Sequence, residues 1–511
     1  MSAIQVIETA DNRVRVMGIG RRGSHMRFSK KWRRSGGTLA TTVLATVTVL
    51  VVLVVVLVVR TRRTTGGEAK ELSLFCAGAL RYPIEQIARE YQREYGVTIE
   101  LQFGGSDTLL GQLEVAGGHA DLFVPADSSY TQLAREKGLT AEAIPLATMR
   151  PVIAARKDSK TDITSIDDLL REDVRVAGVN PDTAAIGRLT RILLQKSGHW
   201  DRLSARIEKD GVYKPMVNEV ANDIKIGSVD AGIIWDATAA QYPELQAVRV
   251  PELAEGVATV DICVLNSTRD PTAALRFARY VAARDKGLQT FARMHFNVLE
   301  GDVWEEVPEL TFFAGSVTRR ALEAVIKDFA AREGVEINTV FNGCGILTGQ
   351  MQILAANQDS RFPDTYMACD IYYLETVKDW YQEAVNVSDT DIVIAVEKGN
   401  PKAIRSLKDL LSPGVRVAVG QPDQCTIGAL TRRLLRHEGI YEKLLATNVV
   451  AQKETSALLV PAVTTGAADA AMAYRTDTLA ESDKVDVIQI DSPLAKAIQP
   501  FSIARSSQQK Q

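Results

Sequence analysis

The sequence is poor in the residues that usually carry metal or redox chemistry. Its 511 residues include only five cysteines and five histidines. The cysteines show no CxxC spacing and the histidines no HxxxH or HExxH spacing, so a zinc-hydrolase interpretation has no support. A strong excess of either charge is also absent, because the net charge is −3. The chain therefore shows no nucleic-acid-binding footprint, and we expect no resident metal or cofactor.

The odd number of cysteines leaves at least one thiol unpaired within the chain. One or two disulfides could form in an oxidising compartment, but the spacing does not assign the pairs. We expect Cys76, on a predicted strand, to be a buried packing residue, and Cys263 likewise.

An uncharged stretch from Thr38 to Val59 follows a basic segment. Residues 13–34 contain nine basic residues and no acidic one, and as a helix the apolar stretch would measure about 33 Å, enough to cross a bilayer. A buried core helix would not be so uniformly apolar, and a cleaved signal peptide would be followed by small residues rather than by Arg60, Arg62 and Arg63. We predict a basic cytoplasmic segment (1–37), one transmembrane anchor (38–59) and a linker (60–70), with the bulk of the chain on the extracytoplasmic side of the cell membrane.

The rest of the chain is an internal repeat. Residues 71–113 align with residues 309–351 without a gap. The similarity resumes downstream, where VRVAGVNPDTAAIG from Val174 matches VRVAVGQPDQCTIG from Val415, and VDAGIIWDAT from Val229 matches ADAAMAYRTD from Ala468. Such self-similarity decides the domain count. We predict two copies of one domain, residues 71–305 and 306–505, followed by a polar tail at 506–511.

Each copy alternates predicted strands and helices. LSLFCA is a short apolar strand, and PIEQIAREYQREYG has the pattern of an amphipathic helix with Ile84, Ile87 and Tyr91 on one face and Gly96 at its end. This alternation predicts a parallel α/β sheet covered on both faces. Later apolar runs, such as RPVIAARKD and DICVLNSTRDP, would suit strands that cross between two lobes.

Three small-residue loops per copy lie between predicted strands and helices. In α/β sheets ligands bind beyond the carboxyl ends of strands, where exposed N–H groups and the helix dipole favour an anion. One such loop is usually an ordinary helix cap, but three that recur in both copies favour a binding site. None of them matches GxxxxGK[ST] or GxGxxG, which argues against a nucleotide. The loops are CAGALR (76–81), GGSD (104–107) and NPDTAAIG (180–187) in the first copy, and AGSVTR (314–319), NGCG (342–345) and QPDQCTIG (421–428) in the second.

Each copy resembles the family of periplasmic molybdate-binding proteins of ABC importers. The resemblance rests on the opening strand-loop-helix, the FGGSDTLLGQLEVAGGHADLFVPAD block, the PDTAAIG loop and the DAGIIW block. It covers nearly all of 71–305 and most of 309–505. It implies two tandem type II periplasmic-binding-protein domains, each of two α/β lobes with a hinge and a central cleft. It also implies an oxyanion held between the lobes by two hydroxyls, backbone N–H groups and a tyrosine.

The resemblance carries the ligand-contacting positions of the family to specific residues of this chain. In family order these are a first serine, a second serine, two backbone donors and a tyrosine, which fall on Ala79, Ser106, Ile186, Val217 and Trp235 in the first copy and on Ser316, Cys344, Ile427, Ser456 and Tyr474 in the second. The loop glycines Gly78, Gly105 and Gly315 complete the predicted sets, together with Cys425, which the PD loop of the second copy would bring to the same cleft.

Several of these positions depart from the family pattern. Ala79 lacks the first hydroxyl, and Trp235 offers either an indole N–H or only a wall. Cys344 replaces the second serine with a weak donor. Three interpretations stay open for Cys344: a packed small residue, a disulfide with Cys425 or Cys369, or a thiol that contacts a soft metal or an unusual anion.

Two further features bear on the cleft. The second copy ends soon after Ile503, so it lacks a counterpart of PTAALRFARYVAARDKGLQTFARMHF (271–296), which resembles the closing helices of the family. Arg81 and Arg319 follow the first loop at matching positions, and each is either a solvated helix-face residue or a source of attraction for an anion.

These features predict a membrane-anchored solute-binding protein for a tetrahedral oxyanion, with molybdate or tungstate as the first choice. Closure of two lobes over the ligand would let the protein dock on an ABC permease, and a separate chain would supply the ATPase because no Walker motif is present. The alternative is an anchored sensor or interaction scaffold in which one or both clefts have lost their ligand. We do not expect an enzyme, because no nucleophile–base pair or acid pair recurs at the clefts.

Overall fold

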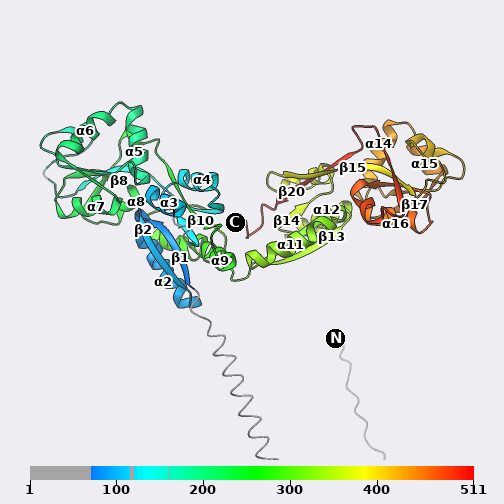
Figure 1. Ribbon diagram of the computed structural model, residues 1–511, viewed down its shortest axis with the longest axis horizontal. Coiled ribbons are helices and arrows are strands. Elements are labelled where there is room, and N and C mark those ends of the chain that lie inside the picture. The colour runs from blue at the N-terminus through cyan, green and yellow to red at the C-terminus, as the bar shows by residue number, and fades with distance from the viewer. Residues whose placement is uncertain (1–70, 116–119, 160, 511) are drawn as a thin grey trace, which may run out of the picture. The chain divides into compact units, whose positions relative to one another are not determined.

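The computed structural model describes residues 71–115, 120–159 and 161–510 (Figure 1). The predicted basic segment at 1–37, the anchor at 38–59 and the linker at 60–70 lie outside these ranges. Within the described ranges, none of the helices has both the length and the apolar composition needed to cross a bilayer.

The first lobe of the first copy is built on a sheet whose inner strands run parallel. β1 (Glu71–Ala77) pairs in parallel with β2 (Thr98–Gly104) and with β3 (Leu122–Val124). Between β1 and β2, α2 (Arg81–Tyr95) buries the predicted apolar stripe and ends at Gly96, whose φ of 70° suits glycine. The strand order is β11-β4-β10-β3-β1-β2. The other elements of this lobe are α3 (Ser106–Val115), α4 (Ser128–Glu136), β4 (Thr140–Met149), β10 (Ala258–Leu265), α9 (Pro271–Ala282), α10 (Gly287–Arg293) and β11 (Asn297–Val298).

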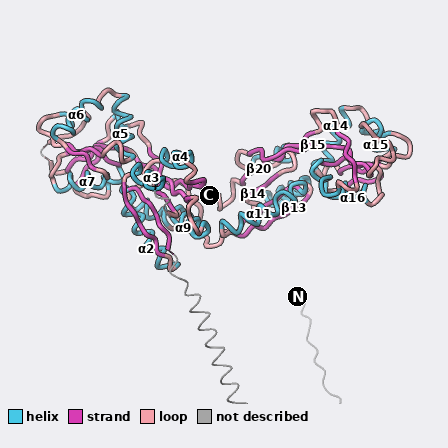
Figure 2. Tube along the Cα trace, viewed as in Figure 1, coloured by secondary structure: helices cyan, strands magenta, loops and turns pink. Residues whose placement is uncertain are grey.

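The second lobe of the first copy is a separate five-stranded sheet in the order β7-β6-β8-β5-β9. Strands lie at the centre of each lobe and helices pack around them (Figure 2). The elements of this lobe are β5 (Pro151–Arg156), β6 (Val176–Val179), α5 (Ala185–Lys196), α6 (Trp200–Asp210), β7 (Val212–Lys214), α7 (Val217–Ile226), β8 (Ala231–Trp235), α8 (Asp236–Ala240) and β9 (Leu245–Val248).

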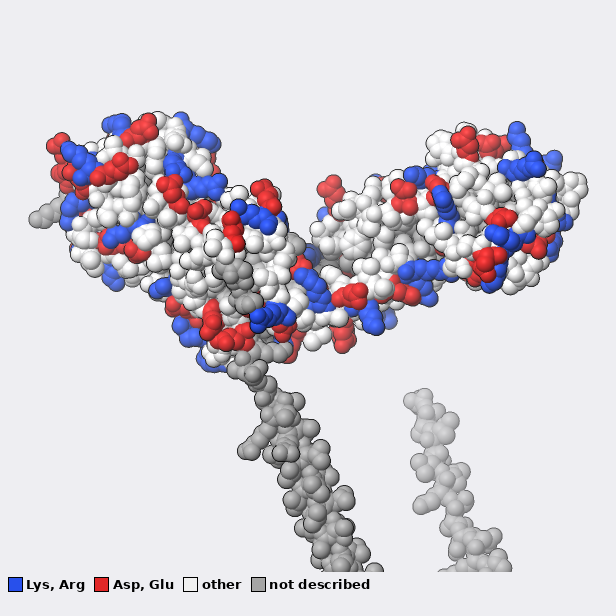
Figure 3. Space-filling view, viewed as in Figure 1, with Lys and Arg blue, Asp and Glu red and all other residues white. Residues whose placement is uncertain are grey.

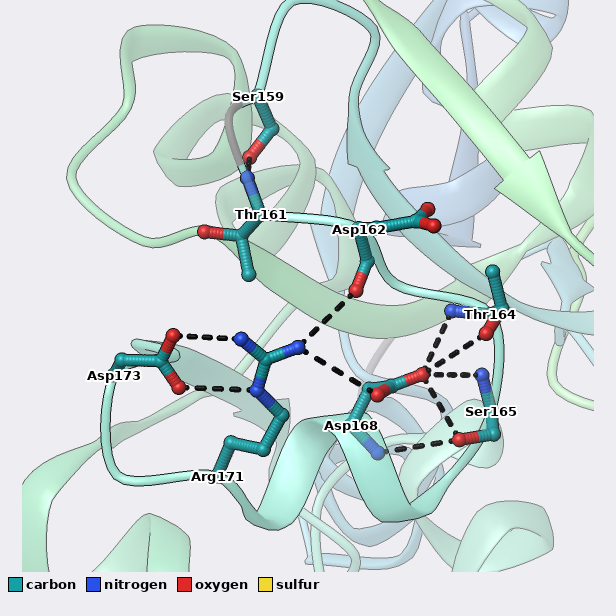
Figure 4. A network of polar contacts seen from close by, with 8 residues as sticks. All are labelled: Ser159, Thr161, Asp162, Thr164, Ser165, Asp168, Arg171 and Asp173. Atoms are coloured by element: carbon teal, nitrogen blue, oxygen red, sulfur yellow. Dashed lines mark hydrogen bonds and ion pairs between the residues drawn. The ribbon is translucent and has the colours of Figure 1, made fainter.

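A polar network fastens the loop between β5 and β6 of this lobe (Figure 4). The Asp168 carboxylate accepts hydrogen bonds from the backbone and hydroxyl of Thr164 and of Ser165. These bonds, the one from the Thr164 backbone foremost, lower the pKa of Asp168 to about 2. Arg171 pairs with both oxygens of Asp173 at 3.0 and 2.7 Å. The loop is therefore held by local side-chain bonds together with the burial of apolar side chains such as Ile163, Ile166 and Leu169.

The predicted all-parallel sheet is wrong in one respect. β10 pairs antiparallel with both β3 and β4, and β5 pairs antiparallel with both β8 and β9. The sheets are therefore mixed, because the strands that connect the lobes return in the opposite direction. RPVIAARKD and DICVLNSTRDP do supply these strands, as β5 and β10.

The second copy repeats the plan in a single nine-stranded sheet. Its central strand, β15 (Val385–Glu397), pairs with β20 through its first half and with β18 and β19 through its second half. In the first copy the equivalent strands β4 and β5 are interrupted at Arg150. The other strands are β12 (Glu309–Gly315), β13 (Glu336–Asn342), β14 (Thr365–Met367), β16 (Val417–Gly420), β17 (Val449–Lys453), β18 (Ala470–Tyr474), β19 (Val485–Gln489) and β20 (Lys496–Ile503). The helices are α11 (Arg319–Glu333), α12 (Cys344–Ala356), α13 (Ile371–Glu375), α14 (Thr426–His437), α15 (Tyr441–Thr447), α16 (Leu459–Thr464) and α17 (Arg475–Thr478).

The two copies differ in how they cover the helix after their first strand. In the first copy Tyr91 of α2 is 1% exposed and stacks edge-on against Phe277 and Tyr280 of α9. At the equivalent position of α11, Phe329 is 48% exposed, and Val325 one turn earlier is 59% exposed. In the described residues no helix follows β20, so α11 has no counterpart of α9 and α10 from its own copy.

Charged side chains of both signs are interspersed over the face shown in Figure 3. Many of them form surface ion pairs, such as Arg175 with Asp230 at 2.7 Å and Arg416 with Asp469 at 2.8 Å. These two pairs occupy equivalent places at the start of β6 and β16, so the repeat extends to its surface polar contacts.

Candidate ligand-binding site

Four helix N-termini and the end of one strand enclose a small cavity between the lobes of the first copy. The turn η1 (Gly78–Leu80) and α3 come from the first lobe, α5 and α7 come from the second, and β8 contributes its last residue, Trp235. The cavity has a volume of about 20 Å³, which is room for about one water molecule. Its walls are Ala77, Gly78, Ala79, Gly104, Gly105, Ser106, Ala126, Ala184, Ala185, Ile186, Met216, Val217 and Trp235.

The structure brings all seven residues predicted for the first copy to this one cavity. Gly78, Ala79, Gly105, Ser106, Ile186, Val217 and Trp235 all line it. Ser106 supplies the one side-chain hydroxyl of the lining residues. Its oxygen accepts a hydrogen bond from the Ala126 N–H at 3.1 Å, which leaves the hydroxyl hydrogen available to a ligand.

The lobes of the first copy are in close contact beside the cavity. The Asp107 N–H of the first lobe donates to the Thr183 carbonyl of the second at 3.2 Å. A Cβ on Gly105 would lie 2.1 Å from the same carbonyl oxygen. Glycine at this position is therefore a condition for closure of the lobes.

The second copy contains a cluster of thiols at the equivalent place. The sulfur of Cys344, the first residue of α12, lies 3.0 Å from the sulfur of Cys369, which follows β14. Both cysteines are buried, as is Cys425 at the N-cap of α14. Gly315 lies against the sulfurs of Cys369 and Cys344. A Cβ added to Gly315 would lie 2.1 Å from the Cys369 sulfur and 2.9 Å from the Cys344 sulfur.

A second group of predicted residues meets across the lobes. The hydroxyl oxygens of Ser316 and Ser456 lie 3.4 Å apart. Ser456 also hydrogen-bonds to the half-buried carboxyl of Asp477, but burial is the larger influence and raises the pKa of Asp477 to about 6. The serines are donors suited to an anion, whereas an ionised Asp477 beside them would oppose one.

Tyr474 and Ile427 complete the predicted set of the second copy. Tyr474 is the last residue of β18 and is fully buried, and its hydroxyl has no hydrogen-bond partner. Burial, with the thiols of Cys369, Cys425 and Cys344 close by, raises the pKa of this hydroxyl well above its ordinary value. Ile427 is the second residue of α14, where backbone N–H groups lack partners within the helix. The Tyr474 hydroxyl is therefore an unpaired buried group beside the three thiols.

One predicted equivalence is wrong by one residue. β1, η1 and α2 have the same lengths as β12, η4 (Ser316–Thr318) and α11. Ser316 therefore opens its turn where Gly78 opens the first, and Val317 is the counterpart of Ala79. The predicted pairing of Ser316 with Ala79 departs from the gapless alignment of residues 71–113 with 309–351, which already pairs Ser316 with Gly78.

Sequence reasoning left out two residues that lie beside the predicted set of the second copy, Cys369 and Asp477. Cys369 occupies the place of Ala126, since Asp127 and Asp370 both cap the next helix. The alignment of VPAD with MACD carried this signal. Asp477 has no acidic counterpart in the first copy, where Thr238 stands at the matching position, and so the repeat gave no sign of it.

Arg81 and Arg319 occupy equivalent exposed positions. Each guanidinium stacks over a phenylalanine of the next strand, Arg81 over Phe103 at 4.5 Å and Arg319 over Phe341 at 5.0 Å. Arg81 is not among the residues that line the first cavity. The solvated helix-face interpretation fits both positions.

The two remaining thiols are core residues of the first copy. Cys76 and Cys263 are fully buried in the core of the first copy, and the sulfur of Cys263 lies 3.6 Å from the Thr131 hydroxyl. Among the residues that the structure describes, no group of three or more histidine, cysteine or acidic side chains is arranged to hold a metal ion.

Comparison with known proteins finds molybdate-binding proteins among the relatives of this chain. The molybdate-binding protein ModA of Mycobacterium tuberculosis is 29% identical over 219 residues, covering 42% of this chain and 80% of that protein. ModA of Escherichia coli is 32% identical over 148 residues, covering 27% of this chain and 56% of that protein. The solved periplasmic molybdate-binding protein of Azotobacter vinelandii is 16% identical with a TM-score of 0.39, covering 45% of this chain and 100% of that protein.

The match to a protein family extends over both copies. The family described as bacterial extracellular solute-binding protein matches residues 72–297 and again residues 310–511. The two matched ranges agree with the internal repeat and with the two-lobed copies of the structure. Relatives of this kind bind solutes and are not enzymes, as the sequence led us to expect. This chain belongs to the family of bacterial extracellular solute-binding proteins and contains two copies of the family's domain in tandem.

Proposed function

We propose that this protein is a membrane-anchored, extracytoplasmic solute-binding protein that presents a tetrahedral oxyanion, molybdate or tungstate first, to an ABC permease with a separate ATPase. The observation that carries the proposal is the convergence of helix N-termini on the interlobe site, with a hydroxyl at the first residue of α3 in the first copy and serines at the equivalent turns of the second. Relatives that bind molybdate support the choice of anion.

Neutral donors are the appropriate chemistry for such a ligand. Backbone N–H groups at helix N-termini carry partial positive charge and can hold a desolvated dianion without a counter-cation. Hydrogen bonds to a charged group contribute about 1.5–3 kcal/mol each. The residues lining the first cavity include no lysine or arginine, so an anion there would rely on amides and hydroxyls alone.

We assign the oxyanion to the second copy. Ser316, Ser456 and Tyr474 give it three side-chain hydroxyls, two of them 3.4 Å apart and one unpaired. The first copy offers the Ser106 hydroxyl alone, in a cavity of about 20 Å³ with apolar walls. Each hydrogen bond that an anion oxygen fails to receive costs about 1–3 kcal/mol of binding free energy. Because the second copy has more hydroxyl donors, an anion bound there would miss fewer hydrogen bonds.

Residues 38–59 supply the proposed anchor. The basic residues before the span place the N-terminus in the cytoplasm and both copies outside it. Tethering would keep the binding domains near the permease, which raises their effective concentration there.

The test is calorimetric titration of the full-length chain in detergent with molybdate, tungstate, sulfate and phosphate. We expect heat of binding with molybdate or tungstate at a stoichiometry of one. Ser316→Ala should remove most of the affinity, and Ser106→Ala should leave it unchanged. Absence of heat with all four anions would overturn the proposal, and loss of binding in Ser106→Ala alone would overturn the assignment to the second copy.

The structure of the first copy favours a second function for that copy. Its cavity is nearly filled and has one hydroxyl, so this copy is suited to act as an interaction scaffold or sensor domain without a bound anion. Pull-down of the permease with the Ser316→Ala variant distinguishes the two roles. A scaffold retains its partner when no anion binds.

A further inference from the structure

The thiols of Cys344 and Cys369 are in contact, and the surrounding structure holds them in place. Their sulfurs lie 3.0 Å apart, and the Cys369 N–H donates to the Cys344 sulfur at 3.1 Å. Cys344 is held at the start of α12 and Cys369 by the capped turn before α13. A disulfide bond is about 2.05 Å long, so the sulfurs need to approach by only about 1 Å.

The first copy shows what the second has changed to admit this pair. There the Ala126 N–H donates to the Ser106 oxygen at 3.1 Å, in the same arrangement as the bond from Cys369 to Cys344. Ala126 has no sulfur, and Ala77 stands where the second copy has Gly315. Because a Cβ on Gly315 would lie 2.1 Å from the Cys369 sulfur, that sulfur occupies space that the first copy fills with a methyl group. The two copies therefore differ at three neighbouring positions, and all three differences are needed for the contact between the Cys344 and Cys369 sulfurs.

The surroundings make one thiol of the pair the more reactive. Burial raises the pKa of Cys344, but its polar neighbours, the hydrogen-bonded Cys369 foremost, outweigh burial and lower the pKa to about 7. The pKa of Cys369 is raised well above its ordinary value by the hydrogen bond to Cys344 and by burial. Because the thiolate is the nucleophile in disulfide exchange, Cys344 is placed to attack first.

We propose that Cys344 and Cys369 are an oxidation site that forms a reversible intradomain disulfide with a thiol–disulfide oxidant, either a small-molecule or a protein disulfide. The Cys344 thiolate attacks one sulfur of the oxidant, forms a mixed disulfide and releases one thiolate, which takes up a proton. Cys369 then loses its proton and attacks the Cys344 sulfur, releasing the second thiolate. Two thiols are oxidised, one disulfide of the oxidant is reduced to two thiols, and no other reactant is needed.

Cys425 is not the partner. It lies in the second lobe, at the N-cap of α14, where its carbonyl oxygen accepts a hydrogen bond from the Gly428 N–H at 2.9 Å. Burial raises the pKa of Cys425 to about 12. A bond from Cys425 to Cys344 would join the two lobes, whereas the bond to Cys369 lies within the first lobe and leaves lobe motion free.

The experiment measures which cysteines become linked. The full-length chain, reduced and purified in detergent, is incubated at graded ratios of oxidised to reduced glutathione, acid-quenched, unfolded and treated with N-ethylmaleimide before peptide mass spectrometry. A parallel sample is refolded from urea in the same buffers, so that burial of the thiols does not limit access. We expect a peptide pair joined through Cys344 and Cys369, two hydrogens lighter than the thiols and restored by dithiothreitol, with Cys76, Cys263 and Cys425 alkylated.

Variants that restore residues of the first copy provide the controls. Cys344→Ser and Cys369→Ala should each leave the remaining thiol alkylated, and Cys425→Ala should leave the linkage intact. Gly315→Ala should lower the yield of the linkage at least tenfold, because its Cβ displaces the Cys369 sulfur. No linkage in either sample, or a linkage through Cys425, would overturn the proposal, and neither result depends on whether the protein binds an oxyanion.

Discussion

The hydroxyl oxygens of Ser316 and Ser456 lie 3.4 Å apart, although the two serines come from different lobes of the second copy. An anion held between them would draw a hydrogen bond from each lobe. We predict that Ser316→Ala and Ser456→Ala each weaken oxyanion binding about ten- to a hundredfold, since one charged hydrogen bond contributes about 1.5–3 kcal/mol. Titration calorimetry checks this, with the exposed Ser482→Ala as the matched control. Equal affinity in all three variants would contradict the site.

Asp477 should make binding at the second copy depend on pH. Burial raises its pKa to about 6, so the carboxyl is ionised and repels an anion above pH 6, and is neutral below it. We predict tighter oxyanion binding at pH 5 than at pH 7, and no such difference in Asp477→Asn. A pH series of calorimetric titrations on both proteins measures the effect.

The same carboxyl has a consequence for stability. Its folded pKa lies above the unfolded value of about 3.9, so the folded state binds more protons between about pH 4 and pH 6. The contribution of Asp477 to stability is therefore favourable at low pH and is lost as pH rises through 6. Asp477→Asn should raise the unfolding midpoint of the second copy at pH 7 more than at pH 4.5. The reverse order would show that the carboxyl is not buried as described.

Closure of the second copy depends on glycine at position 343. A Cβ there would lie 2.5 Å from the carbonyl oxygens of Gln424 and Glu454 in the opposite lobe. We predict that Gly343→Ala prevents full closure and weakens ligand binding at least tenfold, with a larger radius of gyration in small-angle scattering. Gly349→Ala, on the same helix with nothing within 4 Å of its Cβ position, should bind normally. A Gly343→Ala variant that closes and binds like the native chain would contradict the contact.

The two copies should respond differently to loss of the equivalent aromatic residue. Tyr91→Ala removes a fully buried ring that contacts Phe277 and Tyr280 and should cost about 3–5 kcal/mol. Phe329→Ala, at a position 48% exposed, should change stability by about 0.5 kcal/mol or less. Urea unfolding followed by tryptophan fluorescence checks both, and a large loss in Phe329→Ala would show that α11 is covered.

Much of the site in the first copy could be predicted from sequence, because small-residue loops after apolar strands converge at one edge of a sheet. Ser106, Ile186 and Trp235 do line one cavity. The sheet was harder, since an apolar run does not distinguish a parallel strand such as β3 from an antiparallel one such as β10. Position 316 was misassigned because the predicted pairing with Ala79 left the gapless register of the repeat, which sets Ser316 opposite Gly78.

The candidate site of the second copy could be predicted only in part, because its chemistry depends on contacts between distant segments. Cys344 and Cys369 are separated by a helix and a strand, and only the fold brings their sulfurs to 3.0 Å. The raised pKa of Asp477 comes first from its burial, which has no signature in the residues beside it. The anchor predicted at 38–59 remains a prediction.

The unbroken strand β15 gives the second copy a different mechanical character from the first. Where β4 ends at Met149 and β5 begins at Pro151, the rotation that this crossing needs can be taken up by the backbone torsions of Arg150. In β15 the same rotation must be spread as curvature along a strand of 13 residues, whose first half pairs with β20 and whose second half pairs with β18 and β19. A local hinge opens with little elastic resistance. Bending a paired strand costs energy, and release of that energy brings the lobes back together. The second copy, to which we assign the oxyanion, should therefore exchange its ligand more slowly than a freely hinged domain.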